Sequence, residues 1–249
     1  MRRPRIRAVI GLFGPVAALV VLAGCTVTVV GDPAPATVAF SSGPCRYAVA
    51  PDEPAPQGKA FGLPADPSPT PKTGTVTVTL RTSQGPIPLT LNRAQAPCTV
   101  QSFLFLARKT FFDNTPCHRL TADPMLMVLQ CGDPTGSGEG GPGYTIPDEN
   151  PTGFAPAPPG PPGTPPSVIY PTGTVAMANT GQPHSGGSQF FLVYGDSQLP
   201  PAYAVFGTVD AAGLTTLSTV AAGGIAPGMN AQDGKPRLPV TISAVTVSS

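Results

Sequence analysis

The sequence predicts a mainly β fold, in which a closed eight-stranded antiparallel barrel is capped by two α-helices. Apolar and polar residues alternate with a period of two from residue 75 onward, as they do in strands that bury one face. Two later segments carry the apolar spacing of a helix, and the strands and helices do not alternate as in a parallel sheet. Closure of an antiparallel sheet removes its exposed edges, so we expect a barrel.

The barrel region opens with a hairpin. Residues 75–80 alternate between threonine and apolar residues, residues 83–85 form a turn, and residues 87–91 give a second alternating strand. A two-stranded unit of this kind is the expected first pair of the barrel.

Two helices and a series of short strands follow the hairpin. A helix is expected at residues 99–109, because Val100, Phe103 and Leu104 share one face and Pro97 precedes them. A second helix is expected at residues 210–222. The remaining strands are expected at residues 116–120, 125–131, 174–178, 189–194, 204–209 and 240–247.

Residues 1–24 have the pattern of a secretory signal peptide. Four arginines precede an apolar run at residues 8–24, which ends in Leu22-Ala23-Gly24-Cys25. This ending resembles the lipobox of bacterial lipoproteins, and the resemblance implies that Cys25 becomes the lipidated first residue of the mature chain. A retained transmembrane helix is the alternative, although a run of 17 residues is short for spanning a bilayer. Both alternatives place the rest of the chain on the extracytoplasmic face of the cell membrane.

The rest of the chain divides into a tether and a folded domain. Residues 25–73 are rich in Pro, Ala, Ser, Asp and Gly without a regular period, which predicts a lipid-anchored, semi-rigid tether. Cys45 and Tyr47 are an exception, since a disulfide at Cys45 would attach them to the domain. Residues 74–249 form the expected domain, with a Pro-rich surface insertion at residues 151–166.

The charge of the chain excludes an electrostatic site for nucleic acid. The chain has 14 Lys and Arg residues and 13 Asp and Glu residues, and four arginines leave with the signal segment. Ten basic and 13 acidic residues then remain, a net charge of −3. A mildly acidic chain has no basic patch for phosphates, so we expect neither DNA nor RNA as a partner.

The five cysteines divide into one and four. Cys25 takes the lipid, and the other four lie in a chain that we expect to be exported, where an even number predicts two disulfides. Four cysteines allow three pairings, and all three stay open. The candidates are Cys45, Cys98, Cys117 and Cys131.

No sequence pattern indicates a metal, a nucleotide or a hydrolytic triad. The chain has no Cys-x-x-Cys pair, and its two histidines, His118 and His184, are far apart in sequence, which argues against zinc. The glycine-rich residues 136–141 lack the Lys-Ser/Thr of a phosphate-binding loop. No serine or acidic residue accompanies either histidine in a catalytic motif. We expect no cofactor.

Four short motifs in a fixed order carry the functional prediction. They are Cys117-His118-Arg119-Leu120, Gln130-Cys131-Gly132-Asp133, Met177-Ala178-Asn179 and Ser188-Gln189-Phe190-Phe191. Together they resemble the active face of the cyclophilins, a family of peptidyl-prolyl cis/trans isomerases, over about residues 75–247. The resemblance implies an eight-stranded barrel with two capping helices.

The resemblance assigns a role to each matching residue. Arg119 matches the family's essential arginine and Gln130 the glutamine of its Q-G-G-D element, so both are implied to be catalytic. Phe191 is implied to lie in the proline pocket, whereas Phe190 should face the interior, because neighbours on a strand point to opposite sides. The residues implied to bind substrate are Met127, Ala178, Asn179, Gln189, Phe191, Leu199 and Tyr203.

The departures from the family pattern concern the pocket. The spacing from Arg119 to Gln130 is three residues longer than is usual in the family, and counting back from Gln130 puts Met127 where phenylalanine is common. Methionine still suits an apolar slot. Tyr203 replaces the pocket histidine and keeps an aromatic ring with a polar tip. Gln198 replaces the tryptophan that favours cyclosporin, which implies weak cyclosporin binding.

These residue types fit the chemistry of proline isomerisation. Rotation about a peptide bond faces a barrier of about 18–20 kcal/mol, and X–Pro exchange takes tens to hundreds of seconds uncatalysed. No bond is broken, so catalysis needs an apolar slot for the proline ring and a donor that stabilises the twisted amide. The guanidinium of Arg119 stays charged and offers several N–H groups for that purpose.

We therefore expect a peptidyl-prolyl cis/trans isomerase that acts on proline-containing segments of exported proteins at the cell surface. Two alternatives remain open. One is a non-enzymatic cyclophilin-like chaperone or proline-motif binding module, which a displaced Arg119 would favour. The other is a surface lipoprotein whose Pro-rich segments are ligands for aromatic-lined domains.

Overall fold

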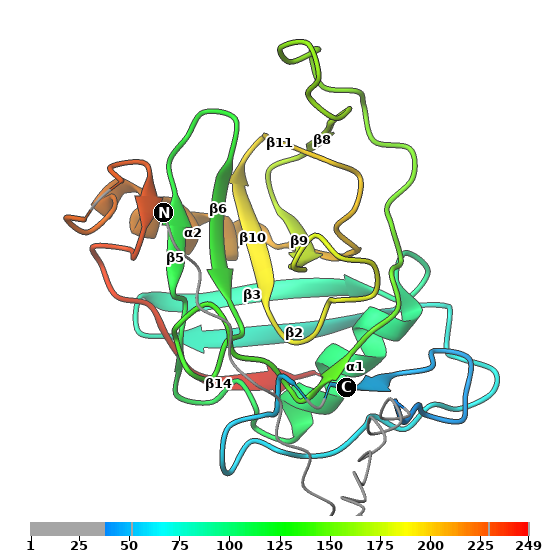
Figure 1. Ribbon diagram of the computed structural model, residues 1–249. Helices are drawn as coiled ribbons and strands as arrows, with labels where there is room; N and C mark the ends of the chain where they lie inside the picture. The colour runs from blue at the N-terminus through cyan, green and yellow to red at the C-terminus, as the bar shows by residue number, and fades with distance from the viewer. Residues whose placement is uncertain (1–37, 51, 229, 249) are drawn as a thin grey trace, which may run out of the picture. The chain divides into compact units, whose positions relative to one another are not determined.

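The computed structural model describes residues 38–50, 52–228 and 230–248 (Figure 1). The expected signal segment 1–24, Cys25 and residues 26–37 of the expected tether lie outside the described residues. Neither helix of the described part has the length and the apolar run that crossing a bilayer requires.

The helices are α1 (Pro97–Arg108) and α2 (Ala211–Gly223). The strands are β1 (Ala48–Val49), β2 (Thr75–Thr82), β3 (Gly85–Asn92), β4 (Thr115–Pro116), β5 (Arg119–Thr121), β6 (Met127–Cys131), β7 (Tyr144–Thr145), β8 (Val168–Tyr170), β9 (Thr174–Met177), β10 (Phe190–Gly195), β11 (Ser197–Leu199), β12 (Val205–Val209), β13 (Asp233–Gly234) and β14 (Thr241–Val247).

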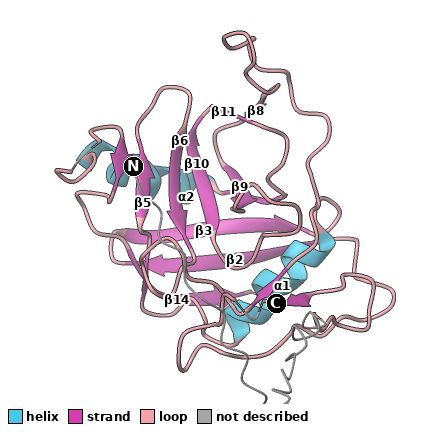
Figure 2. Ribbon diagram, viewed as in Figure 1, coloured by secondary structure: helices cyan, strands magenta, loops and turns pink. Residues whose placement is uncertain are grey.

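Ten of these strands form one antiparallel sheet, in the order β13-β5-β6-β10-β9-β12-β3-β2-β14-β4. The mainly β class and the two helices are confirmed, but closure as an eight-stranded barrel is not. β13 and β4 end the strand order and do not pair with each other among the described strands. Register shifts in β10, β12 and β14 bend the sheet, and Figure 2 shows β5, β6 and β10 running across β2 and β3.

The two helices cover the core of the curled sheet. Helix α1 packs against β14, β12 and β3, and α2 packs against β3 and β10. Phe103 of α1 stacks on Phe112 with ring centroids 4.9 Å apart and meets Phe190 edge-on at 5.4 Å. Phe190 therefore lies in the interior, as predicted. The carboxylate of Glu149 accepts hydrogen bonds from the backbone N–H groups of Cys98 and Thr99 and so caps the start of α1.

Residues 38–50 and 52–73, for which we expect an extended tether, instead lie along the folded part, and we call them the strap. The Cys45–Cys98 disulfide joins the strap to α1. Tyr47 is fully buried, and its hydroxyl donates to the carbonyl of Cys98 at 2.9 Å. The ammonium of Lys59 donates to three backbone carbonyls beyond the end of α1. The two-residue strand β1 of the strap also pairs with β7. Neither single side chains nor a strand of two residues produces an alternating period in the sequence.

The Pro-rich insertion is a surface excursion, which Figure 1 shows at the top. Residues 158–166 are exposed. The base of the excursion is ordered against β8, because the backbone N–H of Ile169 donates to the carbonyl of Ala155 at 2.8 Å. Phe154 meets Tyr170 edge-on, with ring centroids 5.0 Å apart.

Candidate active site

Neighbouring strands bring the predicted catalytic and pocket residues into one row. Arg119 on β5 lies opposite Gln130 on β6, and Gln130 lies opposite Phe191 on β10. Ala176 on β9 continues the row opposite Phe191. Directly opposed residues point to the same face, with Cβ atoms about 4.5–5.5 Å apart. Arg119 and Phe191 therefore stand on one face of the sheet, two strands apart, and we call this the active face.

A second row continues the active face toward the end of β9. Gln189 precedes Phe191 by two positions, so both side chains point to the same side. The backbone N–H of Ala178 donates to the carbonyl of Gln189 at 2.9 Å. The side-chain amide of Asn179 donates to the carbonyl of Ala202 at 2.8 Å and is thereby held at the edge of this row.

The polar side chains of the active face form one chain of hydrogen bonds. Arg119 Nη1 donates to Gln130 Oε1 at 3.2 Å, and Gln130 Nε2 donates to Gln189 Oε1 at 2.9 Å. Gln189 Nε2 donates to the carbonyls of Gly138 and Gly140, both at 2.9 Å. We call Arg119, Gln130 and Gln189 the polar half of the active face. Each of these side chains has its orientation set by its neighbour.

The glycine-rich residues 136–141 anchor the far end of this chain, and Asp133 holds them in place. Asp133 is fully buried, and its carboxylate accepts from the backbone N–H groups of Thr135 and Gly138 at 2.7 and 2.6 Å. Burial alone would raise the pKa of Asp133, but hydrogen bonds from the Thr135 hydroxyl and from the backbone N–H groups of the loop lower it below its ordinary value. The loop therefore helps to orient Gln189.

Asp233 binds Arg119 at the other end of this series of hydrogen bonds. The sequence analysis did not predict a role for it. Arg119 Nε and Nη2 donate to the two carboxylate oxygens of Asp233 at 2.7 and 2.6 Å. These hydrogen bonds raise the pKa of Arg119 more than burial lowers it, so the guanidinium stays charged. In sequence, Asp233-Gly234 indicates only a turn, and nothing relates it to a residue 114 positions earlier.

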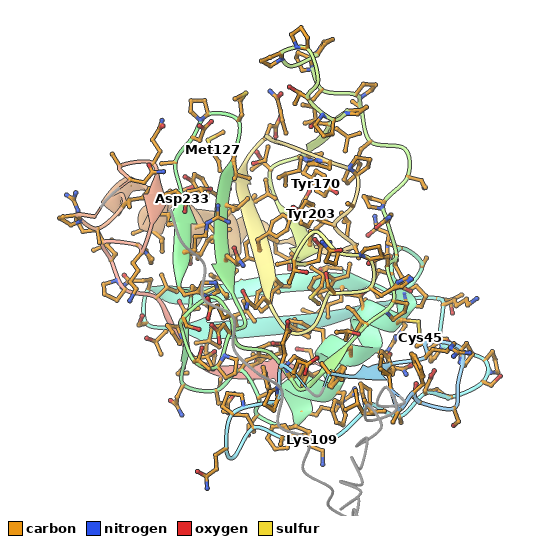
Figure 3. All side chains as sticks on the ribbon, in the orientation of Figure 1. Cys45, Lys109, Met127, Tyr170, Tyr203 and Asp233 are labelled. Atoms are coloured by element: carbon orange, nitrogen blue, oxygen red, sulfur yellow. A yellow bond between two sulfur atoms is a disulfide. The ribbon has the colours of Figure 1, made fainter. Side chains whose placement is uncertain are left out.

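An apolar pocket adjoins the polar half and is built around Phe191, which is 5% exposed. The ring of Tyr203 meets Phe191 edge-on at 5.5 Å, and Tyr170 lies 6.4 Å from each of these rings. Figure 3 shows Tyr170 and Tyr203 close together, to the right of Asp233. Leu199 and Leu126 pack on the same cluster. We call these five residues the apolar half of the active face.

Met127 lies apart from this cluster. Its backbone pairs with Gly195 at the irregularity in β10, and its side chain lies against that glycine. Alternation along β6 from Gln130 instead puts Val128 and then Leu126 on the active face. Among the described residues it is Leu126, and not Met127, that packs on the pocket cluster. Substrate binding by Met127 stays a prediction.

A cavity of about 710 Å³ extends the active face beyond Gln130 and Gln189. Asn179 and the glycine-rich loop line one part of it, and the strap closes another. The strap residues in its wall are Ala50, Asp52, Glu53 and Pro54.

The second disulfide lies beside the polar half. Cys117, two residues before Arg119, is bonded to Cys131, the neighbour of Gln130. With Cys45–Cys98, this bond selects one of the three possible pairings. Next to it, Gly132 has a φ of +91°, and a Cβ there would collide with the carbonyl of Ser188. The start of β10 can therefore approach β6 closely where Gln130 and Gln189 meet.

The two histidines take no part in the hydrogen-bonded chain. Burial lowers the pKa of His118, and its buried Nδ1 has no hydrogen-bond partner among the described residues. His184 Nδ1 accepts from the backbone N–H of Asp148 at 3.0 Å. Within the described ranges, no three side chains of the metal-binding types come together.

Known proteins resemble this chain in sequence and in fold. The family model for cyclophilin type peptidyl-prolyl cis-trans isomerases matches residues 77–247. The probable peptidyl-prolyl cis-trans isomerase B of Mycobacterium leprae is 50% identical over 204 residues, which are 81% of this chain and 65% of that protein. The corresponding protein of Mycobacterium tuberculosis H37Rv is 49% identical over 204 residues, 81% of this chain and 63% of that protein.

A solved structure agrees with these matches. The crystal structure of a cyclophilin type peptidyl-prolyl cis-trans isomerase from Cryptosporidium parvum superposes with a TM-score of 0.56 at 27% identity and covers 71% of this chain and 99% of that one. The chain spans slightly less than two thirds of the length of its mycobacterial relatives. With the family model matched over the whole active face, the chain belongs to the cyclophilin-type peptidyl-prolyl cis-trans isomerase family.

Proposed function

We propose that this chain catalyses the cis/trans isomerisation of X–Pro peptide bonds. The observation that carries the proposal is the single row in which Arg119 stands two strands from Phe191. One face of the sheet thereby offers a charged donor and an apolar pocket whose backbones lie about 9.5 Å apart, since neighbouring strands lie about 4.7–4.9 Å apart.

The apolar half receives the proline ring in this mechanism. Burial of the ring against Phe191 and Tyr203 removes the adjoining amide from water, which favours the less polar twisted amide over the planar one. No proton has to leave the substrate. The apolar half therefore needs a complementary surface that excludes water, and it needs no nucleophile. Ala178 and Asn179, at the end of β9, hold the extended substrate backbone.

The polar half stabilises the twisted state. Asp233 and Gln130 engage three of the five N–H groups of Arg119, so two remain for the substrate. These donate to the proline carbonyl or to the pyramidal nitrogen as the bond twists. A donor that binds the twisted amide more strongly than either planar form raises the rate without tight ground-state binding.

An exchange assay tests this function on the full chain. Magnetisation exchange between the cis and trans forms of a short Ala-Pro peptide should be about 100-fold faster or more with catalytic amounts of the protein. Peptide binding with exchange at the uncatalysed rate would contradict the proposal and favour a cyclophilin-like binding module instead. The lengthened hairpin before Met127 is the feature that makes this second outcome worth measuring.

We further propose that the clients are exported proteins at the extracytoplasmic face of the cell membrane. Two disulfides support this place, because such bonds persist in oxidising compartments. The anchor is a lipid on Cys25, next to the signal segment. Cys25→Ser should therefore release the protein from the membrane fraction, and retention of this variant in the membrane would contradict lipid anchoring.

Weak cyclosporin binding is also part of the proposal. Gln198 lies on β11 beside Leu199, and its backbone N–H donates to the carbonyl of Met125 at 2.8 Å. A polar amide here replaces the wide apolar plate that a tryptophan would offer. Gln198→Trp should tighten cyclosporin binding about tenfold in calorimetry, and an unchanged affinity would contradict the role of Gln198.

A further inference from the structure

We propose that Asp233 is a positioning residue of the active face, which sets the plane of the Arg119 guanidinium so that its remaining N–H groups face the apolar half. The proposal rests on the isomerase function proposed for Arg119. It adds a residue from β13, a strand outside the four motifs that carry the family resemblance.

The strand order shows from which side Asp233 approaches Arg119. β5 lies between β13 on one side and β6 and β10 on the other. Asp233 therefore approaches Arg119 from the side opposite to Gln130 and Phe191. Figure 3 shows Asp233 to the left of Tyr203, across the strands of this part of the sheet.

The contact between the two side chains fixes an orientation rather than only a position. Nε and Nη2 of Arg119 donate to separate carboxylate oxygens at 2.7 and 2.6 Å. Two parallel hydrogen bonds of this kind hold the planar guanidinium in the plane of the carboxylate. Gln130 adds a third point at Nη1, 3.2 Å away. Rotation about the last side-chain bonds of Arg119 would break at least one of these contacts.

Charge attraction alone does not account for the pair. Each side chain is 37% exposed, so water and salt screen the attraction and its contribution to stability is small. A catalytic donor, in contrast, is sensitive to displacement by about 1 Å. The value of this pair therefore lies in placing Arg119 and not in holding the fold.

The pairing of β13 with β5 does not depend on the Asp233 carboxylate. The backbone pairs are Asp233 with Thr121 and Gly234 with Leu120. The backbone N–H of Ala122 also donates to the carbonyl of Gln232 at 2.8 Å. Removal of the carboxylate should therefore free the guanidinium while the strand stays in place, and a variant can report on positioning.

Separate measurement of kcat and KM in the full chain tests the proposal. Asp233→Ala should lower kcat about tenfold and change KM less than about twofold, because the lost placement matters in the twisted state. Asp233→Asn keeps one acceptor and should lose about threefold in kcat. The matched control is Asp113→Asn, which also removes one carboxylate but lies beyond α1 and should keep the wild-type rate.

A double variant separates positioning from a general effect on the protein. If Asp233 acts through Arg119, then Asp233→Ala causes no further loss of kcat in the Arg119→Ala background. An equal loss in both backgrounds would overturn the proposal, as would a folded Asp233→Ala protein with kcat within about twofold of wild type. Asp233→Asn answers the same question if the alanine variant does not fold.

A nuclear magnetic resonance measurement keeps the proposal testable even if the protein is inactive. The Arg119 Nε–H resonance should exchange slowly with water in the wild-type protein, because a carboxylate accepts that hydrogen. The resonance should exchange rapidly in Asp233→Ala, which leaves no acceptor at this position, and stay slow in Asp113→Asn. Rapid exchange in the wild type, or slow exchange in a folded Asp233→Ala protein, would overturn the positioning role independently of catalysis.

Discussion

The two halves of the active face are held in different ways. In the polar half, Arg119, Gln130 and Gln189 are joined by hydrogen bonds that continue into Asp233 and the glycine-rich loop. In the apolar half, the rings meet edge-on or tilted, without hydrogen bonds between their side chains in the described set. Hydrogen bonds demand particular donors at particular distances, whereas packing tolerates a change of residue if size and apolarity are kept.

This difference accounts for where the sequence departs from the cyclophilin pattern. Tyr203 and Gln198 replace residues at or beside the pocket, and the lengthened hairpin supplies Leu126 to it. The polar residues of the motifs are all retained. The largest loss of activity should therefore come from the polar half, at its charged donor Arg119, and the following variants test this expectation.

Arg119→Ala should have the largest effect. Loss of the charged donor should lower kcat/KM by about 100-fold or more, the range observed when one transition-state donor is removed. The melting temperature should change little, because the side chain is partly exposed. Arg119→Lys keeps the charge but not the planar fork, so its kcat/KM should lie between those of the wild type and Arg119→Ala. An Arg119→Ala protein with wild-type kcat/KM would remove this residue from the mechanism.

Phe191→Ala should have the next largest effect. The loss of one ring from the pocket removes about 1.5–3 kcal/mol of apolar contact, part of which neighbouring residues recover, so kcat/KM should fall about tenfold. Tyr203→Phe is the matched control, since it keeps the ring and removes only the hydroxyl. A larger loss in Phe191→Ala than in Arg119→Ala, measured with the same peptide, would reverse the proposed order of the two halves.

Gln130→Ala should have a smaller effect than either. It removes two hydrogen bonds, one from the charged Arg119 and one to Gln189. Because Asp233 still holds Arg119 through two others, the loss should be about 1 kcal/mol, so kcat/KM should fall about fivefold. Gln130→Glu keeps an acceptor for Arg119 and should retain more activity than Gln130→Ala. Equal activity of both variants would show that the link to Arg119 does not matter.

The smallest expected effect tests which residue lines the pocket: Leu126, as in the structure, or Met127, as expected from the motif spacing. Leu126→Ala should raise KM about threefold, because it removes a side chain that packs on the pocket cluster. Met127→Ala should change stability but not KM, since Met127 lies against Gly195. A larger increase in KM for Met127→Ala than for Leu126→Ala would show that Met127, the residue found by counting back from Gln130, lines the pocket instead.

The sequence predicted those features that local patterns encode. Apolar spacing located both helices to within a few residues, and alternation at Phe190 and Phe191 assigned one ring to the core and one to the active face. The motif match identified Arg119, Gln130 and Gln189, which the structure joins by hydrogen bonds.

Most features that depend on distant residues were not predicted. Asp233 lies 114 positions from Arg119, and only the β13–β5 pairing brings the two together. The strap carries no periodic pattern, because single side chains and the two-residue strand β1 attach it. The sequence indicated attachment at Cys45 and Tyr47 but not at Lys59. The number of strands in the sheet also differed, since strands of two residues such as β4 and β13 are too short to show alternation.

The central claim is that one substrate proline touches both halves of the active face at once. Intermolecular nuclear Overhauser effects with an Ala-Pro peptide measure this directly. The account predicts contacts from the proline ring protons to Phe191 and Tyr203, together with a shift of the Arg119 Nε–H resonance on binding. Proline contacts to any other face, or a bound peptide that leaves the Arg119 resonance unchanged, would contradict it.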